Sequence, residues 1–171
     1  MCGIAGYVGD RESADVLVDA LSKLEYRGYD SAGIAVFDHG NIKVKKCKGR
    51  LANLVEKMDE EGKPQGHVGI GHTRWATHGE PSDINSHPHG NKRVTIVHNG
   101  IIENYKKLKD FLVGEGYSFA SETDTEVAAK LLDYYYDGDP MKTIAKVLSE
   151  IKGSYALGIY VQGISLMRYL Q

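Results

Sequence analysis

The sequence predicts an α+β domain built in layers. Strand-like runs come in groups, such as 34–37 and 42–47, and helical periodicity occupies the stretches between groups. The 171 residues are enough for one domain with a real core, and no repeat or low-complexity tract divides them. This order favours a layered α+β domain over a regular βαβ sheet, in which a helix would follow every strand.

The predicted strands are short apolar or alternating runs bounded by glycine and polar turns. They lie at 4–8, 34–37, 42–47, 68–70, 93–98 and 155–161, and 164–170 is either a further strand or a disordered end. The first of these is expected to be buried along its length. The polar stretches 25–33 and 82–90 are expected to be loops, and the second is long enough to suggest a functional loop.

Helices are predicted where apolar residues recur three or four positions apart. They are expected at about 12–25, 51–62, 105–113, 123–135 and 140–151. Asp10 or Ser13 is the candidate cap of the first helix. Thr123 and Glu126 have the spacing of a capping box, and Asp139-Pro140 supplies a cap followed by a first-position proline.

Composition excludes several classes of protein. The formal net charge of −2 argues against a nucleic-acid partner bound by charge. No apolar run has the length of a membrane span, and no signal sequence is recognisable. Two cysteines, Cys2 and Cys47, do not indicate a disulfide framework. We therefore expect a cytoplasmic protein without nucleic-acid or membrane partners.

Cys2 follows the initiator methionine directly. If Met1 is removed, Cys2 carries a thiol and a free α-amino group, whose pKa of roughly 8 lets it serve as the base that activates the sulfur. Taken alone, a cysteine at this position is usually incidental. Cys47 lies among lysines that could lower its pKa, namely Lys43, Lys45, Lys46 and Lys48. An incidental strand cysteine is the favoured interpretation of Cys47.

Polar residues elsewhere suit an amino-acid substrate, and each has a plainer alternative. Arg74 can clamp a carboxylate through two parallel hydrogen bonds, or it can be a surface arginine. Asn99 and Gly100 can supply the two donors of an oxyanion hole, or they can form a type I′ hairpin turn. Asp124 can accept a substrate ammonium group, or it can complement the dipole of the helix that it begins.

The chain contains seven histidines, two of them in the run His87-Pro88-His89. A metal site at this run stays open as an alternative, but neither a cysteine partner nor a helical i, i+4 histidine pair joins it. We therefore expect no metal and no cofactor. A thiol with its own base, an oxyanion hole, a carboxylate clamp and an ammonium acceptor together match an amino acid attacked at a side-chain carbonyl. Glutamine fits, with its amide nitrogen released as ammonia.

Several longer motifs in the sequence resemble those of one protein family. They are Cys-Gly-Ile at 2–4, EYRGYDSAG at 25–33, GHTRWATHGEP at 71–81, His-Pro-His at 87–89, VHNGIIEN at 97–104 and SETDTE at 121–126. Over about residues 1–160 the chain is similar to the glutaminase domain of the glutamine–fructose-6-phosphate aminotransferases, the glucosamine-6-phosphate synthases of hexosamine biosynthesis. That family belongs to the N-terminal-nucleophile, class II glutamine amidotransferases.

The resemblance implies a four-layer αββα sandwich of the N-terminal-nucleophile hydrolase type. It also implies catalytic roles: Cys2 is the nucleophile with its α-amine as base, and Asn99 and Gly100 form the oxyanion hole. The implied substrate-binding residues are Arg74, Thr77 and His78 at the glutamine α-carboxylate and Asp124 at its α-amino group. Trp75 is implied to be the gate to the synthase site, and Arg27 and Tyr29 to lie in the loop that shields the thiol.

The activity implied by the resemblance is hydrolysis of L-glutamine through a γ-glutamyl thioester to glutamate and ammonia. In the full enzyme, a homodimer, ammonia would pass to fructose-6-phosphate. We expect residues 1–171 to form a glutaminase domain that is incomplete at its C-terminal end, because 162–171 departs from the family's continuation and the synthase half is absent. The alternative is an inactive domain of this fold that acts in binding or regulation.

Overall fold

The computed structural model describes residues 2–38, 40–76 and 79–162. Along the chain its elements are β1 (Gly3–Val8), α1 (Ser13–Ser22), the 3₁₀ helix η1 (Glu25–Arg27), β2 (Ser31–Asp38), β3 (Asn41–Lys48), α2 (Leu51–Glu61), β4 (Val68–Arg74), β5 (His89–Gly90), β6 (Val94–Ile102), α3 (Tyr105–Gly114), α4 (Asp124–Tyr135), α5 (Pro140–Glu150) and β7 (Gly153–Val161).

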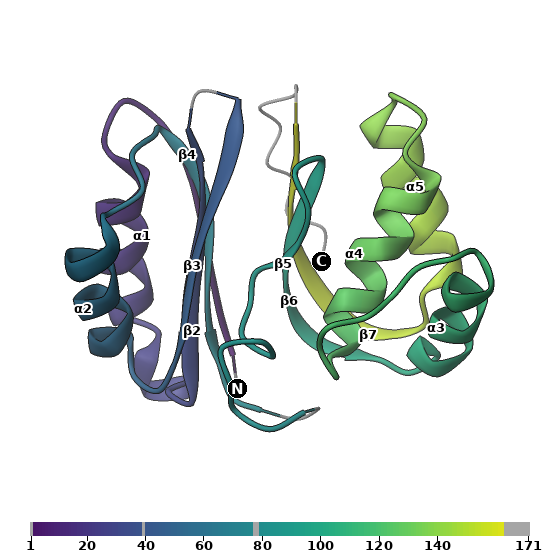
Figure 1. The fold of residues 1–171 in the computed structure, drawn as a ribbon, viewed down its shortest axis with the longest axis horizontal. Coiled ribbons are helices and arrows are strands. Elements are labelled where there is room, and N and C mark those ends of the chain that lie inside the picture. Colours follow the sequence, from purple (N-terminus) through teal and green to yellow (C-terminus); the bar gives the residue numbers. More distant parts are fainter. Residues whose placement is uncertain (1, 39, 77–78, 163–171) are drawn as a thin grey trace.

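The elements form four layers (Figure 1). Helices α1 and α2 cover one sheet, whose strand order is β1-β4-β2-β3. The second sheet has the order β5-β6-β7, and helices α3, α4 and α5 cover its outer face. All paired strands in the described part of the chain are antiparallel. The predicted α+β class and the αββα sandwich are confirmed.

The apolar residues divide among three clusters that follow the layers. Two of them join a sheet to its helices, and each includes fully buried leucines such as Leu17 or Leu131. The third lies between the two sheets and consists of the buried residues Ala35, Ile70, Val97 and Tyr160. On β4, residues two apart share a face of the sheet, so the face that carries Ile70 also carries His72 and then Arg74. The space between the sheets therefore changes from apolar to polar along β4.

The first helix is shorter than predicted, and neither candidate cap is used. It starts at Ser13 and ends at Ser22, where the prediction was 12–25. The N-cap residue is Glu12, whose side chain makes no capping hydrogen bond. Ser13 instead donates its hydroxyl to Val68 O at 3.4 Å, and its backbone N–H bonds to Gly66 O at 2.7 Å. Hydrogen bonds to the backbone at Gly66 and Val68 thus take the place of a side-chain cap at the start of α1.

The two later helix starts follow the sequence closely. The Asp139 carboxylate accepts from the N–H groups of Met141 and Lys142, with Pro140 in the first turn. Thr123 accepts from Glu126 N–H at 3.2 Å. Glu126 does not complete the capping box, because its carboxylate accepts from the N–H groups at 120 and 121 instead.

Asn99-Gly100 is not a hairpin turn. Strand β6 runs through both residues to Ile102 and pairs with β7 along its length, up to Ile102 opposite Gly153. Burial explains the continuation, because Ile102 is fully buried in the core beneath α4. Gly100 has φ +118°, and a Cβ there would collide with Ser154 O. Only glycine fits this position without strain.

Smaller differences concern strand ends and exposure. The first strand alternates, and Val8 is 50% exposed, so it is buried on one face only. Strand β2 begins at Ser31, within the stretch expected to be a loop. The long loop contains the short strand β5. The expectation for 164–170 lies outside the described residues. None of the helices in the described ranges is long and apolar enough to cross a membrane.

Candidate active site

Cys2 lies directly before β1, against the end of β4. Trp75 N–H donates to Cys2 Sγ at 3.3 Å, and Sγ lies 3.5 Å from Trp75 O. The side chain is half-buried, and burial raises the pKa of the thiol despite the opposing hydrogen bond from Trp75. At neutral pH the sulfur is therefore protonated, and nucleophilic attack needs a base that takes its proton.

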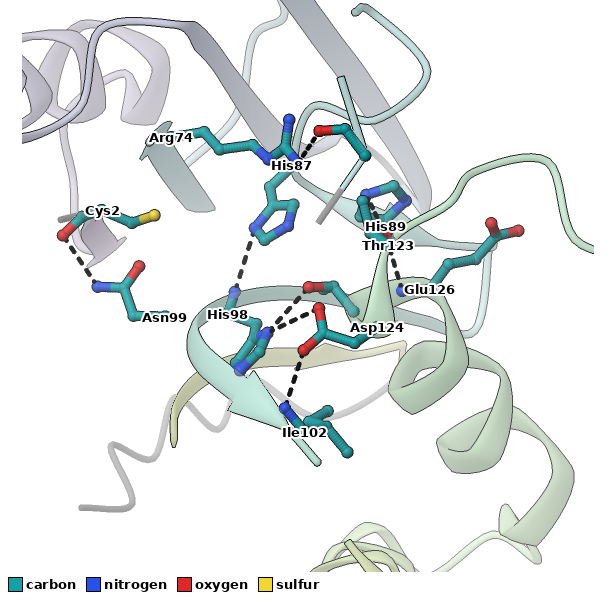
Figure 2. A network of polar contacts seen from close by, with 12 residues as sticks. Cys2, Arg74, His87, His89, His98, Asn99, Ile102, Thr123, Asp124 and Glu126 are labelled. Carbon is teal, nitrogen blue, oxygen red and sulfur yellow. Dashed lines mark hydrogen bonds and ion pairs between the residues drawn. The ribbon is translucent and has the colours of Figure 1, made fainter. Parts of the chain in front are cut away.

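Asn99 and Gly100 reach the same place from the second sheet. Asn99 Nδ2 donates to Cys2 O at 3.2 Å (Figure 2), and its Oδ1 lies 2.9 Å from His72 Nε2. Gly100 lines the cavity beside Cys2. A side-chain amide and a glycine on consecutive residues of one strand therefore stand next to the thiol.

Two opposite charges face this cavity. Arg74 ends β4 and is 4% exposed, and its guanidinium donates to Gly79 O at 3.0 Å. Asp124 begins α4 and is 5% exposed, and its carboxylate accepts from Ile102 N–H at 2.9 Å. Figure 2 shows that the second carboxylate oxygen of Asp124 faces the His98 ring, with His98 Nδ1 at 3.8 Å.

One small cavity brings the candidate residues together. It is lined by Cys2, Arg74, Trp75, His87, His98, Gly100, Thr123, Asp124 and Thr125. Its volume of about 20 Å³ has room for roughly one water molecule. An amino acid would therefore fit only after the surrounding side chains move apart. The lining includes a thiol, a guanidinium and a carboxylate that the sequence analysis singled out, beside imidazole and hydroxyl groups.

Among the remaining predicted residues, Trp75 lines the cavity and Tyr29 contacts Trp75. Trp75 is 47% exposed and packs edge-on against Tyr29, with ring centroids 5.3 Å apart. Arg27 ends η1 and is half-buried. Thr77 and His78 lie outside the described residues, so their predicted contacts stay predictions.

The sequence analysis did not predict that His72, His87 and His89 form a buried row that reaches the cavity at His87. The rings of His72 and His87 are 4.1 Å apart, and those of His87 and His89 are 5.1 Å apart. Burial lowers the pKa of His72 and of His89 to about 3 and that of His87 well below its usual value. These rings are therefore neutral at physiological pH. The period of two along β4, which places His72 on the face of Arg74, could have revealed one of them.

The alternative of a metal site at His87 and His89 finds no support in the geometry. Within residues 2–38, 40–76 and 79–162, no group of three or more His, Cys, Asp or Glu side chains is arranged to hold a metal ion. His89 Nε2 instead lies 3.2 Å from the hydroxyl of Thr123, the N-cap of α4. The pair thus belongs to the polar packing between the sheets.

Cys47 stands in different surroundings. It lies on β3, at the edge of the first sheet opposite β1. Burial and the nearby Asp83 raise the pKa of its thiol, and the opposing effect of Lys57 is smaller. The suggestion that lysines leave this thiol with a lowered pKa is therefore wrong, because burial and Asp83 outweigh them. Neither cysteine forms a disulfide.

A larger cavity of about 620 Å³ opens between β3 and α4, away from Cys2. Most of its charged side chains form ion pairs within the lining: Lys45 with Glu61 at 2.8 Å, Lys57 with Asp83 at 2.9 Å, and Lys130 with Glu126 at 3.4 Å. Lys46 donates to backbone carbonyls, and Asp133 pairs with Arg93 outside the lining. Its lining contains no cysteine. Although it is larger, this cavity lacks the nucleophile that the cavity at Cys2 contains.

Comparisons with known proteins show the family and the fold to which the chain belongs. The family model of the glutamine amidotransferase domain matches residues 72–166. The chain therefore belongs to the glutamine amidotransferase family. Its fold resembles that of glutamine phosphoribosylpyrophosphate amidotransferase from B. subtilis, with a TM-score of 0.81 and 29% identity over 94% of this chain and 35% of that one.

Within this family, the sequence is similar to enzymes named glutamine–fructose-6-phosphate aminotransferase (isomerizing). Identity is 59% over 161 residues with the enzyme of Clostridium tetani and 52% over 159 residues with that of Thermus thermophilus. These matches cover 93% and 92% of this chain. The chain spans 26% of the length of each of these curated relatives. The resemblance to this family that the sequence motifs indicated is confirmed.

Proposed function

We propose that this chain hydrolyses L-glutamine to L-glutamate and ammonia through a γ-glutamyl thioester on Cys2. The observation that carries the proposal is the single cavity lined by the Cys2 thiol, the Arg74 guanidinium and the Asp124 carboxylate. Such a lining matches the three parts of glutamine, which are a carbonyl to attack, an anionic carboxylate and a cationic amine. Membership of the glutamine amidotransferase family supports the same substrate.

The reaction begins with proton transfer. After removal of Met1, the unprotonated α-amine of Cys2 takes the thiol proton, and the sulfur attacks the γ-carbon of glutamine. The resulting oxyanion is stabilised by Asn99 Nδ2 and by the N–H of Gly100. The carbon–nitrogen bond then breaks, the α-ammonium returns its proton to the leaving nitrogen, and ammonia departs. Water attacks the thioester, releasing glutamate and restoring the thiol.

Buried charges hold the substrate in this scheme. Arg74 binds the α-carboxylate through charge-assisted hydrogen bonds, and Asp124 accepts from the α-ammonium. Both side chains are almost fully buried, so their charges are weakly screened and bind strongly. By the family resemblance, Thr77 and His78 add contacts to the α-carboxylate.

The longer relatives suggest the fate of the ammonia. We propose that in a full-length protein it is transferred to fructose-6-phosphate, which the names of the similar enzymes contain. Trp75 would separate the two sites, and Arg27 and Tyr29 would shield the thiol. In this proposal residues 1–171 belong to a glutaminase domain, and the full-length protein, a cytoplasmic homodimer, also contains a sugar-phosphate synthase part.

The decisive test compares the two cysteines. Protein with Cys2 at its amino terminus, verified by intact mass, is incubated with glutamine, and ammonia and glutamate are measured. We expect Cys2→Ala to abolish hydrolysis and Cys47→Ala to preserve it. A glutamine analogue with an electrophilic side chain should add its mass to Cys2. Labelling found mainly on Cys47, or activity retained by Cys2→Ala, would sink the proposal.

A further inference from the structure

His72 lies fully buried between two oxygen atoms of the second sheet. Its Nε2 is 2.9 Å from His98 O and 2.9 Å from Asn99 Oδ1. A backbone carbonyl can only accept a hydrogen bond, so the contact with His98 O requires a hydrogen on Nε2. The neighbouring atom of Asn99 must then be its oxygen, because an amino group would face that hydrogen with hydrogens of its own.

The other end of the Asn99 amide meets a second atom that can only accept. Asn99 Nδ2 donates to Cys2 O at 3.2 Å. Reversing the amide would place its oxygen against Cys2 O and its amino group against the His72 N–H, two repulsive contacts. The carbonyls of Cys2 and His98, which can only accept, therefore fix which atom donates in each hydrogen bond. The His98 carbonyl holds the hydrogen of His72 on Nε2, and that hydrogen in turn fixes the orientation of the Asn99 amide.

The surroundings of His72 suit a neutral donor and no other role. Burial lowers its pKa to about 3, so the ring carries no charge. Its Nδ1 has no hydrogen-bond partner among the described residues, and the ring packs against His87. The ring thus faces Asn99 with one N–H and is held by packing on its other side.

We infer that His72 is a positioning residue, whose N–H keeps the amino group of Asn99 turned toward the oxyanion formed on Cys2. The inference rests on the proposed function, in which Asn99 supplies one donor of the oxyanion hole. That donor acts on charge that develops only in the transition state. Loss of His72 should therefore lower kcat and leave KM for glutamine almost unchanged.

A double-mutant cycle separates this role from a structural one. In the otherwise unchanged protein, His72→Leu should lower kcat by about tenfold or more, below the roughly 100- to 1000-fold cost of losing an oxyanion donor outright. KM should change by less than about threefold. In an Asn99→Ala background, His72→Leu should lower kcat by no more than about twofold, because its partner is already gone.

A conservative variant supplies the matched control. The side chain of His72→Gln ends in an amino group that can replace the Nε2 hydrogen, whereas the shorter side chain of His72→Asn cannot reach as far. We expect His72→Gln to recover kcat to within about threefold of the unchanged protein and His72→Asn to stay low. If His72→Leu does not fold, His72→Asn takes its place in the cycle.

Equal kcat losses in both backgrounds, or no loss in the first, would overturn the inference. A second measurement does not depend on activity: long-range ¹H–¹⁵N correlation spectra report the tautomer of each imidazole, and His72 should carry its hydrogen on Nε2. A hydrogen on Nδ1 would overturn the inference by itself. If the unchanged protein releases no ammonia, the proposed function fails, and the spectra still decide the orientation of Asn99.

Discussion

Two cavities among the described residues differ in size and in chemistry, and the smaller one carries the groups that suit a reaction. The cavity at β3 and α4 has a volume of about 620 Å³, against about 20 Å³ at Cys2. In the larger one, lysines and carboxylates neutralise one another as ion pairs. In the smaller one, Arg74 and Asp124 face a thiol. The arrangement of charge, rather than the volume, identifies the site.

The two cysteines also differ in the groups around them rather than in burial. Both are half-buried, and burial raises the pKa of both thiols. Neither is therefore activated by its surroundings alone. What distinguishes Cys2 is that its own α-amine can become a base and that Asn99, Gly100 and Arg74 stand beside it.

The largest effect should come from retaining Met1, which removes that distinction. The nitrogen of Cys2 is then an amide, which cannot take the thiol proton, so hydrolysis should be lost even if glutamine still binds. Ammonia release is compared between samples with and without Met1, each verified by intact mass. Equal activity would refute the α-amine as the base, and His87 or His98, which line the same cavity, would have to be tested instead.

A smaller but clear effect is expected from the charges in the Cys2 cavity. A hydrogen bond to a charged group contributes about 1.5–3 kcal/mol, so Arg74→Ala should lower kcat/KM for glutamine roughly tenfold or more. Asp124→Ala should do the same. Steady-state kinetics decide the matter: if both variants keep the original kcat/KM, the charges that hold glutamine lie elsewhere.

The histidine row, which extends from His87 at the Cys2 cavity to His89 at the larger one, should limit stability in acid. The pKa of His72 and of His89 is about 3 in the folded protein and about 6.5 when unfolded. The free energy of unfolding should therefore be highest above about pH 6.5 and should fall as the pH drops toward 3, by on the order of 1 kcal/mol per pH unit for each histidine, because the unfolded chain binds protons that the buried rings do not.

Urea unfolding at about pH 7.5 and about pH 5 measures this loss. The variant His89→Gln, which removes one of the three buried histidines with a lowered pKa, should show a smaller difference between the two pH values. An unchanged difference would contradict the assignment of acid sensitivity to the buried row.

The smallest effect is expected in the larger cavity. Lys57 and Asp83 form an ion pair at 2.9 Å in which Asp83 is half-exposed, and their hydrogen bond raises the pKa of Lys57. Exposed pairs contribute about 0–1 kcal/mol, so Lys57→Ala should change the free energy of unfolding by no more than that. The variant should leave kcat/KM for glutamine unchanged. A tenfold loss of kcat/KM would show that the larger cavity is part of the active site.

Local patterns in the sequence were enough for much of the fold. The Asp139-Pro140 pair starts α5, Thr123 caps α4, and apolar spacing locates α2 and α3. Each depends on residues within a few positions, which is the range over which propensity and capping act. The candidate residues Cys2, Arg74 and Asp124 were likewise chosen from their side chains and their places at the ends of elements.

Only the tertiary structure decided how these parts meet. Asn99-Gly100 has the local preference of a turn, yet pairing with β7 and burial of Ile102 keep it in a strand. Ser13 bonds to β4 rather than capping its helix. His72 and Asn99 are 27 residues apart and come from different sheets, so no spacing in the sequence predicts their hydrogen bond. Contacts of this kind depend on how the two sheets stack, which local propensity does not encode.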